Sequence, residues 1–541
     1  MSTLVLRNGR IHTLDPNQPA ATALAVHGRR ILAVGADADV LDAAGPRATV
    51  LDLEGRAVLP GFWDCHIHFY DWALVRFRLD LGGCASLEDF LARLGGRAVH
   101  SPLGEWIMGH NWNENAWAEP RMPDRRDLDG VAPDHPVILW RADLHLAVAN
   151  SLALRLAGID ADTPDPPKGA IARDEHGQPT GVLLDGGINL VKAILPDPSP
   201  DEVAHAMELG MAAMHRLGIT AVHDIRLMGG LEHRSAFGAW QRLREAGRIS
   251  LRAFAALPGE RLEEAVALGL RTGLGDDYLR VGALKYFTDG SMGARTAWVL
   301  EPYLDGSGSG LCCMPFEEIR QCLATADANG LAVTVHAIGD RSGNALATAF
   351  EELARARKPG QGPPIPHRVE HAQMLRPEDI ARLARAGVAV SAQPIHLVDD
   401  MDMIDRSLGE LGRHCYPFRS LVEAGVPLVF GSDAPVADPN PWLGVCAAVT
   451  RARPDGAPEG GWHPAQRLDV AQAVAAYTSS AAKAYGLDDR LGSLAPGKLA
   501  DLVVLDRDPL AVDAAELAGT TVELTVFDGA VRHADGDFAG L

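Results

Sequence analysis

The chain has 541 residues, of which 47% are hydrophobic and 22% are charged. This length suits a large barrel with accessory domains, and the composition excludes a largely disordered chain. Asp and Glu number 71 against 50 Lys and Arg, which gives a formal net charge of −21. Such a surface repels a phosphate backbone, so we expect no nucleic-acid partner.

Targeting signals and disulfides are not expected from this sequence. Residues 1–9 contain no basic segment leading into an apolar one, and no run of eighteen apolar residues follows. A cytoplasmic protein without a membrane partner is therefore expected. The seven cysteines are odd in number and form no C-x-x-C pair, which is a poor basis for disulfides or a structural zinc knuckle.

Short strand-like segments occur at both ends of the chain. They are residues 4–6, 23–26 and 30–34 near the start and residues 502–505 and 521–527 near the end. Turn sequences such as Asn8-Gly9 separate them. We expect residues 1–57 and 490–541 to pair into one small composite β-sandwich.

Residues 76–189 follow the first predicted barrel strand. The stretch is too long for a loop between a strand and a helix, and it holds Trp106, Trp112, Trp117 and Trp140. It is therefore predicted to be an inserted α+β subdomain. Its position after a strand end makes it a candidate lid over an active site.

Amphipathic helices alternate with short apolar strands in the rest of the chain. The first such helix has a capping box from Ser199 to Glu202 and ends at Gly218. Later strands are expected at residues 220–222, 331–335, 388–392 and 427–430. This alternation predicts an α/β fold, a (β/α)8 TIM-like barrel over residues 58–75 and 190–489. A doubly wound open sheet is the alternative.

His66 and His68 lie two residues apart in a predicted strand, so both imidazoles can face one metal ion. The pair alone is equally consistent with two hydrogen-bonded strand histidines. Further residues of the metal-binding type end other predicted strands, namely His336, His371 and Asp433. Catalytic groups of a (β/α)8 barrel lie at this end of the strands, so the set indicates a metal site.

Lys285 lies within the predicted strand at residues 279–287. A cation inside a barrel is unfavourable unless it is paired or neutralised. From the residues alone, an ion pair with Asp289 or Asp433 is the favoured explanation.

Several motifs resemble the amidohydrolase superfamily. They are residues 58–68, 431–433 and 492–502, together with Lys285, His336 and His371. Residues 141–145, 150–151, 289–291, 335–341 and 431–435 are similar to the amidohydrolase-3 subgroup, which includes N-substituted formamide deformylases. Leu144 stands where the subgroup usually has glycine, and Asp185 stands where glutamate is common. Both departures concern the shape of the substrate site more than metal binding.

The resemblance implies a binuclear metal centre. His66, His68 and Asp433 would bind one divalent ion, and His336 and His371 would bind a second. The resemblance further implies a CO2-derived carbamate on Lys285 that bridges the ions. Zinc is the expected metal, with manganese or iron as alternatives. A hydroxide between the ions would attack the substrate carbonyl, with Asp433 as the catalytic residue that moves the proton to the leaving amine.

The implied reaction is hydrolysis of a C–N bond other than a peptide bond, in a small molecule such as an N-substituted formamide or an N-acyl amine. A deaminase, an esterase or a decarboxylase on the same scaffold is the alternative, and a non-catalytic scaffold protein is a third interpretation. A homodimer is one expectation for the assembly.

Six residues are candidate substrate contacts, each with a structural alternative. Examples of those alternatives are a packed rim histidine, an ion pair from Arg141 to Asp143, and a rim salt bridge. The candidates are His145, Arg141, His223, Trp112, Arg295 and His396.

Overall fold

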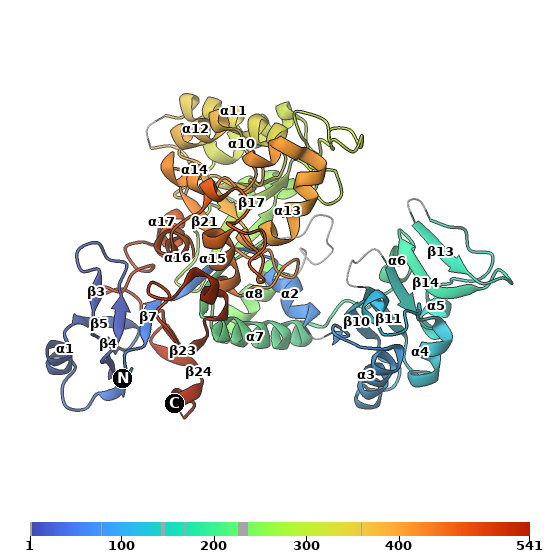
Figure 1. Cartoon of the computed structure of the whole chain (residues 1–541), viewed down its shortest axis with the longest axis horizontal. Coiled ribbons are helices and arrows are strands. Elements are labelled where there is room, and N and C mark those ends of the chain that lie inside the picture. Colours follow the sequence, from blue (N-terminus) through green and yellow to red (C-terminus); the bar gives the residue numbers. More distant parts are fainter. Residues whose placement is uncertain are drawn as a thin grey trace. The chain divides into compact units, whose positions relative to one another are not determined.

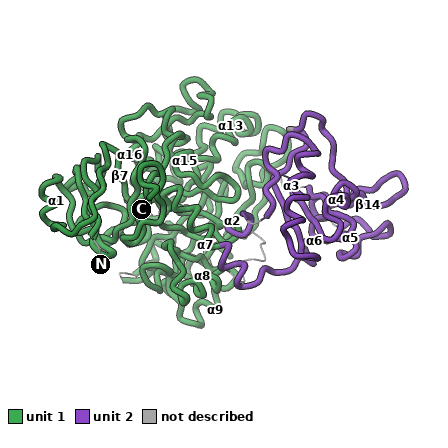
Figure 2. Tube along the Cα trace, turned by 90° about the horizontal axis from the view of Figure 1, so that it is seen from below, with its two compact units in different colours: residues 1–72, 207–541 green, residues 73–206 purple. Residues whose placement is uncertain are grey.

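The computed structural model describes residues 3–76, 78–141, 146–166, 169–225, 236–358 and 360–540. The chain forms two compact units, residues 1–72 with 207–541 and residues 73–206, which Figure 2 colours separately. Among the described residues, no helix combines the length and the apolar composition needed to cross a membrane.

Eight parallel strands form the central sheet of the larger unit. In sheet order they are β8 (Phe62–Ile67), β15 (Ile219–Asp224), β16 (Arg252–Pro258), β17 (Leu279–Phe287), β18 (Val333–Ala337), β19 (Arg368–His371), β20 (Ala389–Ala392) and β21 (Leu428–Phe430). The outer two meet where the Asp433 backbone nitrogen donates to the His66 carbonyl oxygen at 2.7 Å. This closure confirms the (β/α)8 barrel and excludes the open sheet.

Helices follow the barrel strands, and the sequence sets where they begin and end. The Ser199 backbone nitrogen donates to Glu202 at the start of α7 (Pro200–Arg216), as the capping box predicts. Gly387 ends α12 (Pro377–Ala386) in the left-handed region, with φ of 67°. Figure 1 shows α12 beside α11 (Asp340–Ala356), which also packs against α10 (Phe316–Ala328).

The remaining helices of this unit are mostly short. They are α1 (Asp37–Ala44), α8 (Ala236–Glu245), α9 (Leu262–Ala267), α13 (Pro394–Leu408), α14 (Phe418–Glu423), α15 (Pro441–Thr450), α16 (Val470–Ala476) and α17 (Ser479–Ala484). A further helix, α2 (Phe69–Val75), follows β8 at the end of the first segment.

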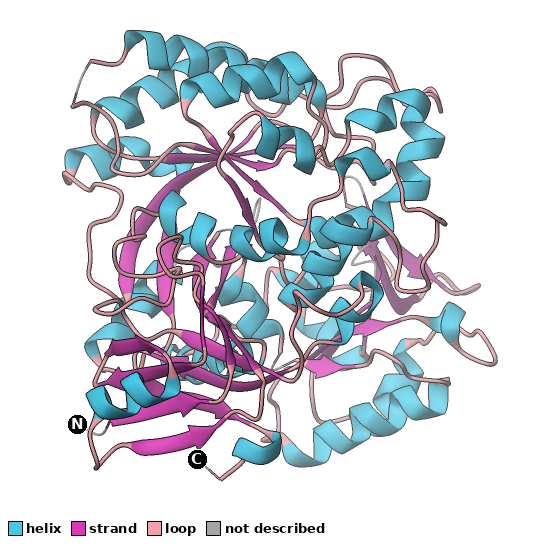
Figure 3. Cartoon of the chain, turned by 60° about the vertical axis from the view of Figure 1, so that its left-hand side comes forward, coloured by secondary structure: helices cyan, strands magenta, loops and turns pink. Residues whose placement is uncertain are grey.

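Both chain ends contribute to a β-sandwich in the same unit. One sheet has the order β5-β4-β1-β6 and the other the order β24-β23-β22-β7-β2-β3. Their bounds are β1 (Thr3–Arg7), β2 (Arg10–His12), β3 (Ala20–Ala21), β4 (Ala23–His27), β5 (Arg30–Gly35), β6 (Thr49–Asp52), β7 (Ala57–Pro60), β22 (Leu502–Leu505), β23 (Val522–Phe527) and β24 (Ala530–Ala534). Figure 3 shows these strands beside both termini. Leu24 and Leu502, from opposite sheets, share one buried core.

The smaller unit is an α+β fold with a sheet of its own. Its strands have the order β13-β14-β12-β11-β10-β9. Its elements are β9 (Leu79–Asp80), α3 (Leu87–His100), β10 (Ile107–Trp112), α4 (Arg125–Val131), β11 (Val137–Arg141), β12 (Leu146–Ala149), α5 (Ser151–Leu156), β13 (Gly169–Arg173), β14 (Pro179–Asp185) and α6 (Ile188–Lys192). The unit spans residues 73–206, so it extends beyond the predicted range of 76–189 at both ends.

A buried ion-pair cluster joins the barrel to the sandwich. Arg252, at the start of β16, is 2% exposed and donates to Asp501 at 2.7 and 2.8 Å and to Asp528 at 3.1 Å. Burial lowers the pKa of Arg252, but the two carboxylates outweigh it and hold that pKa above its ordinary value. The guanidinium is therefore charged, and it binds carboxylates on the sandwich side of this junction.

The Arg252→Met substitution should lower the free energy of unfolding by about 3–5 kcal/mol, because it leaves buried carboxylates without their counter-charge. Thermal and urea-induced unfolding would measure the loss. Arg7→Met is the control, since Arg7 and its partner Asp52 have side chains that are 43% and 39% exposed. That change should cost about 0–1 kcal/mol. Equal losses in the two variants would contradict the role given to Arg252.

Candidate metal centre

A cavity of about 440 Å³ lies where the barrel strands end. Its wall includes residues that lie near the ends of six different strands or begin the segments that follow them. Those used below are His66, His68, Lys285, His336, His371, His396 and Asp433. The barrel therefore brings together all six predicted metal-binding residues and adds His396 to them.

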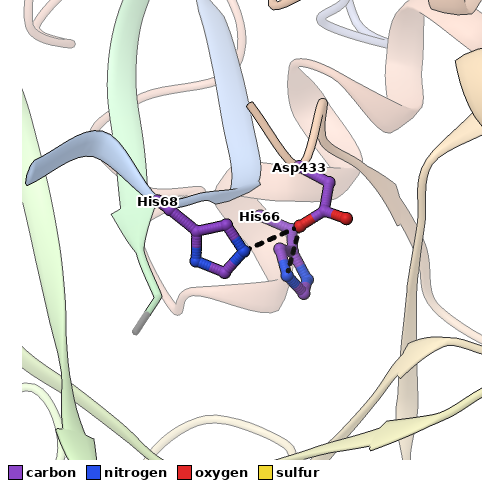
Figure 4. A group of neighbouring side chains, drawn as sticks. All are labelled: His66, His68 and Asp433. Carbon is purple, nitrogen blue, oxygen red and sulfur yellow. Dashed lines mark ion pairs between the residues drawn. The ribbon is translucent and has the colours of Figure 1, made fainter. Parts of the chain in front are cut away.

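His66, His68 and Asp433 form a tight buried group, shown in Figure 4. One carboxylate oxygen of Asp433, Oδ1, lies 3.3 Å from His66 Nε2 and 2.9 Å from His68 Nε2. The two imidazoles come from the end of β8, and Asp433 follows β21. Three ligand atoms converging in this way match the donors that divalent ions such as zinc take in proteins.

The other ring nitrogen of each β8 histidine is held by a fixed acceptor. His66 Nδ1 lies 2.5 Å from Glu370 Oε2, and His68 Nδ1 lies 2.5 Å from the backbone oxygen of Ile225. With Nδ1 donating, each Nε2 keeps its lone pair for a ligand bond. The surroundings therefore fix both the tautomer and the ring orientation that metal binding needs.

Glu370 belongs to the site, although no role was predicted for it from the sequence. It is fully buried and also accepts hydrogen bonds from Arg368 Nε, at 2.6 Å, and from the Thr334 hydroxyl. Burial raises the pKa of Glu370, but Arg368 and His66 outweigh it and hold that pKa well below its usual range. The signal for this residue was a carboxylate inside an apolar strand, directly before His371.

Asp64 is a second residue of the site for which no role was predicted from the sequence. Its carboxylate accepts hydrogen bonds from the Ser432 backbone nitrogen at 3.0 Å, the Ser432 hydroxyl at 2.5 Å and the His66 backbone nitrogen at 3.2 Å. Burial raises the pKa of Asp64 to about 6 despite these donors. Asp64 thus fastens the segment that carries His66 to the segment that carries Asp433.

His371, His396 and Asp433 form a second group in which one ligand atom from each residue lies within 4.8 Å of the others. His396 Nε2 is 3.7 Å from Asp433 Oδ2, the oxygen that the first group does not use. His336 lies on the same wall, with its ring centroid 4.4 Å from that of His371. Its Nε2 is 3.0 Å from the backbone oxygen of Gly290.

Lys285, on β17, is 2% exposed and lines the cavity. Its Nζ lies 4.7 Å from the ring centroid of Phe287. The carboxylate of Asp289, one expected ion-pair partner, accepts backbone hydrogen bonds from Trp298 at 2.9 Å and Gly339 at 2.8 Å. That carboxylate thus has a separate structural task in joining two loops.

The remaining substrate candidates are placed differently. His223 is buried against Arg368 and the Tyr485 hydroxyl, and Arg295 pairs with Asp305 at 2.7 Å. In the smaller unit, Trp112 is fully buried and donates to the Leu139 oxygen, and Arg141 pairs with Glu114 at 2.9 Å. His145 lies outside the described residues. Among the candidates that lie within the described residues, His396 alone lines this cavity.

The charge state of the cavity suits a divalent cation. Burial and the charge of Lys285 lower the pKa of His336 to about 3, and burial beside His336 holds the pKa of His371 well below its usual range. Both rings are therefore neutral near pH 7 and have a lone pair to offer. Burial raises the pKa of Asp433, but the neighbouring imidazoles of His66 and His68 outweigh it and hold that pKa well below its usual range.

Polar atoms without partners point to the same conclusion. His66 Nε2, His371 Nδ1 and His396 Nε2 are buried and have no hydrogen-bond partner among the described residues. Buried polar atoms are rarely left without one, because each costs about 1–3 kcal/mol. Neutral imidazole nitrogens and an ionised carboxylate are the donors that zinc and related divalent ions prefer, so the residues fit such an ion.

Comparisons with known proteins identify the family of this chain. The profile described as "Amidohydrolase family" matches residues 49–533. The N-substituted formamide deformylase of Arthrobacter pascens is 31% identical over 552 residues, covering 98% of each chain. Protein LONG AFTER FAR-RED 3 of Arabidopsis thaliana is 34% identical over 514 residues, covering 93% of this chain and 87% of that protein.

A solved structure gives the same result for the fold. An uncharacterized metal-dependent hydrolase from Pyrococcus horikoshii OT3 matches with a TM-score of 0.77 at 28% identity, covering 95% of this chain and 99% of that one. The family profile and these relatives span nearly the whole chain, including both ends of the barrel and the residues around the cavity. This chain therefore belongs to the amidohydrolase family.

Proposed function

We propose that this metal-dependent amidohydrolase cleaves the C–N bond of an amide-like small molecule. The observation that carries the proposal is the group of His66, His68 and Asp433, in which fixed acceptors already hold both Nδ1 atoms. The name of the Arthrobacter relative supports an N-substituted formamide or an N-acyl amine as the substrate. Zinc is the proposed metal, with two ions per chain.

A bound divalent cation polarises a carbonyl group and makes hydroxide available near neutral pH. The chain's own residues supply the rest of the chemistry. Asp433 is ionised, faces the cavity and can accept the proton of the attacking water. It can then donate this proton to the nitrogen of the departing amine, which leaves as a neutral molecule.

Lys285 is proposed to carry a carbamate. In this step Lys285 first loses a proton, the neutral Nζ then attacks the carbon of CO2, and a second proton leaves the nitrogen, so a buried cation becomes an anion. Its location supports the change, because Lys285 is 2% exposed and its charge adds to burial in lowering the pKa values of His336 and His371. An anion at the same position would instead favour cations in the cavity.

Removing metal with a chelator should abolish hydrolysis of N-formyl and N-acyl amines, and zinc or manganese should restore it. The same treatment should lower stability by about 3–4 kcal/mol relative to protein with metal at 100 to 1,000 times its dissociation constant. Metal analysis and thermal unfolding measure the two effects. Less than one ion per chain, with no response to chelators, would leave the non-catalytic scaffold as the better interpretation.

The Lys285→Arg substitution should abolish activity although it keeps the positive charge, because a guanidinium does not form the carbamate. A ¹³C carbamate signal should appear in the wild-type protein supplied with ¹³CO2 and disappear in this variant. Lys285→Ala should also be inactive, and short carboxylic acids that enter the vacated space should restore part of the activity. Full activity of Lys285→Arg would favour an ion-pairing role for this lysine.

The Glu370→Gln substitution should weaken metal binding about 10- to 100-fold, because it removes the charged acceptor that orients His66. Metal competition with a chromophoric chelator measures this affinity. Arg252→Met is the matched control, since it also disturbs a buried ion pair but lies outside the cavity wall. A similar loss of affinity in both variants would show that stability, and not the orientation of His66, is responsible.

A further inference from the structure

Gln373 lines the cavity but belongs to neither of the two histidine groups. Its side chain is 5% exposed, and its amide oxygen, Oε1, is buried without a hydrogen-bond partner among the described residues. A buried carbonyl oxygen without a donor is costly, and native proteins keep few of them. This oxygen is therefore an acceptor available to a molecule in the cavity.

The backbone that leads to Gln373 is held in a strained conformation. His371 and Ala372 have φ of 66° and 46°, a region that residues with a side chain rarely adopt. The Ala372 nitrogen donates to the Ala337 oxygen at 3.0 Å, and the Gln373 backbone oxygen accepts from the Tyr416 nitrogen at 2.6 Å. Neighbouring segments thus enforce the strain, which is typical of residues whose position matters for ligand binding.

The rest of the cavity wall indicates which molecule can supply the missing donor. Phe287, Met292 and Ile338 contribute apolar side chains to it. Asp400 also lines the wall, but its Oδ2 already accepts a hydrogen bond from the Tyr416 hydroxyl at 2.5 Å. An apolar wall with a buried neutral acceptor suits an amide whose nitrogen carries one hydrogen and one uncharged apolar group.

We propose that Gln373 Oε1 accepts a hydrogen bond from the N–H group of the substrate amide and so selects N-monosubstituted over N,N-disubstituted amides. The inference rests on the proposed hydrolysis of an amide-like small molecule and adds a specificity-determining residue to it. A second substituent on the nitrogen removes the donor and leaves the buried oxygen unsatisfied. A site built around such a hydrogen bond rejects the analogue that lacks it.

The test compares N-butylformamide with N-butyl-N-methylformamide as substrates of the metal-loaded wild type and of Gln373→Met, which has a side chain of similar length without the acceptor. The variant should lose about tenfold in kcat/KM for the first compound and stay within about twofold for the second. Comparing the ratio of the two substrates between the proteins cancels their different intrinsic reactivities.

Gln393→Met is the matched control. Gln393 is 1% exposed and its Oε1 is likewise buried without a partner among the described residues, but it lies outside the cavity wall. This variant should keep the wild-type ratio of the two substrates. Thermal unfolding separates a structural role, because Gln373→Met removes a costly buried atom and should melt at or above the wild-type temperature. A lower melting temperature, with equal losses for both substrates, would overturn the inference.

Equilibrium binding of the same two amides to metal-free protein tests the inference without turnover. The wild type should bind N-butylformamide about tenfold more tightly than its N-methyl analogue, and Gln373→Met should bind the two about equally. This measurement on the wild type decides the question even if the variant fails to fold, since equal affinities would contradict the inference.

The two measurements also separate the inference from the proposed function. Selective binding of N-butylformamide by a metal-loaded protein that hydrolyses neither amide would overturn the function and support the role of Gln373. Hydrolysis with the same substrate ratio in wild type and Gln373→Met would overturn the inference and leave the function intact. A wild type that neither binds nor hydrolyses either compound would overturn both.

Discussion

The junction between β21 and β8 is the contact on which both the fold and the site depend. The Asp433 backbone nitrogen donates to the His66 oxygen at 2.7 Å, and the His68 nitrogen donates to the Ala434 oxygen at 2.9 Å. These bonds close the barrel, and they also fix the backbone of the three residues of the first candidate metal group, His66, His68 and Asp433. Asp433 has φ of 64°, a conformation costly for a residue with a side chain, which the two-sided anchoring enforces.

Around this junction, a buried ion pair supports one of the histidines. Arg368 contacts Glu370, and Glu370 in turn contacts His66 Nδ1. Each ion would be unfavourable alone in so buried a place, and each is offset by its neighbour. The consequence is a histidine whose orientation is fixed before any cation binds. The same barrel that provides hydrophobic packing thus also provides the electrostatic support for the site.

The sequence predicted the barrel and the site to different extents. Strand ends are readable from local patterns, and parallel strands bring their carboxyl ends to one edge, so His66 and Asp433 could be placed together. The contacts of Glu370 could not be predicted in this way, because they join strands whose pairing is determined only by the closed barrel. Trp112 shows a related limit of sequence-based prediction. An indole side chain suits a ligand contact as well as a hydrophobic core, and packing in the smaller unit places Trp112 in the core.

The two histidine groups differ in how firmly hydrogen bonds fix the orientation of their imidazole rings. In the first, Glu370 and the Ile225 oxygen hold both Nδ1 atoms, so the imidazoles lose little freedom when a cation binds. In the second, His396 belongs to the first turn of a helix, and its Nε2 has no hydrogen-bond partner among the described residues. The first group is therefore held more firmly than the second. Asp433 belongs to both groups, because its Oδ1 faces His66 and His68 and its Oδ2 faces His396.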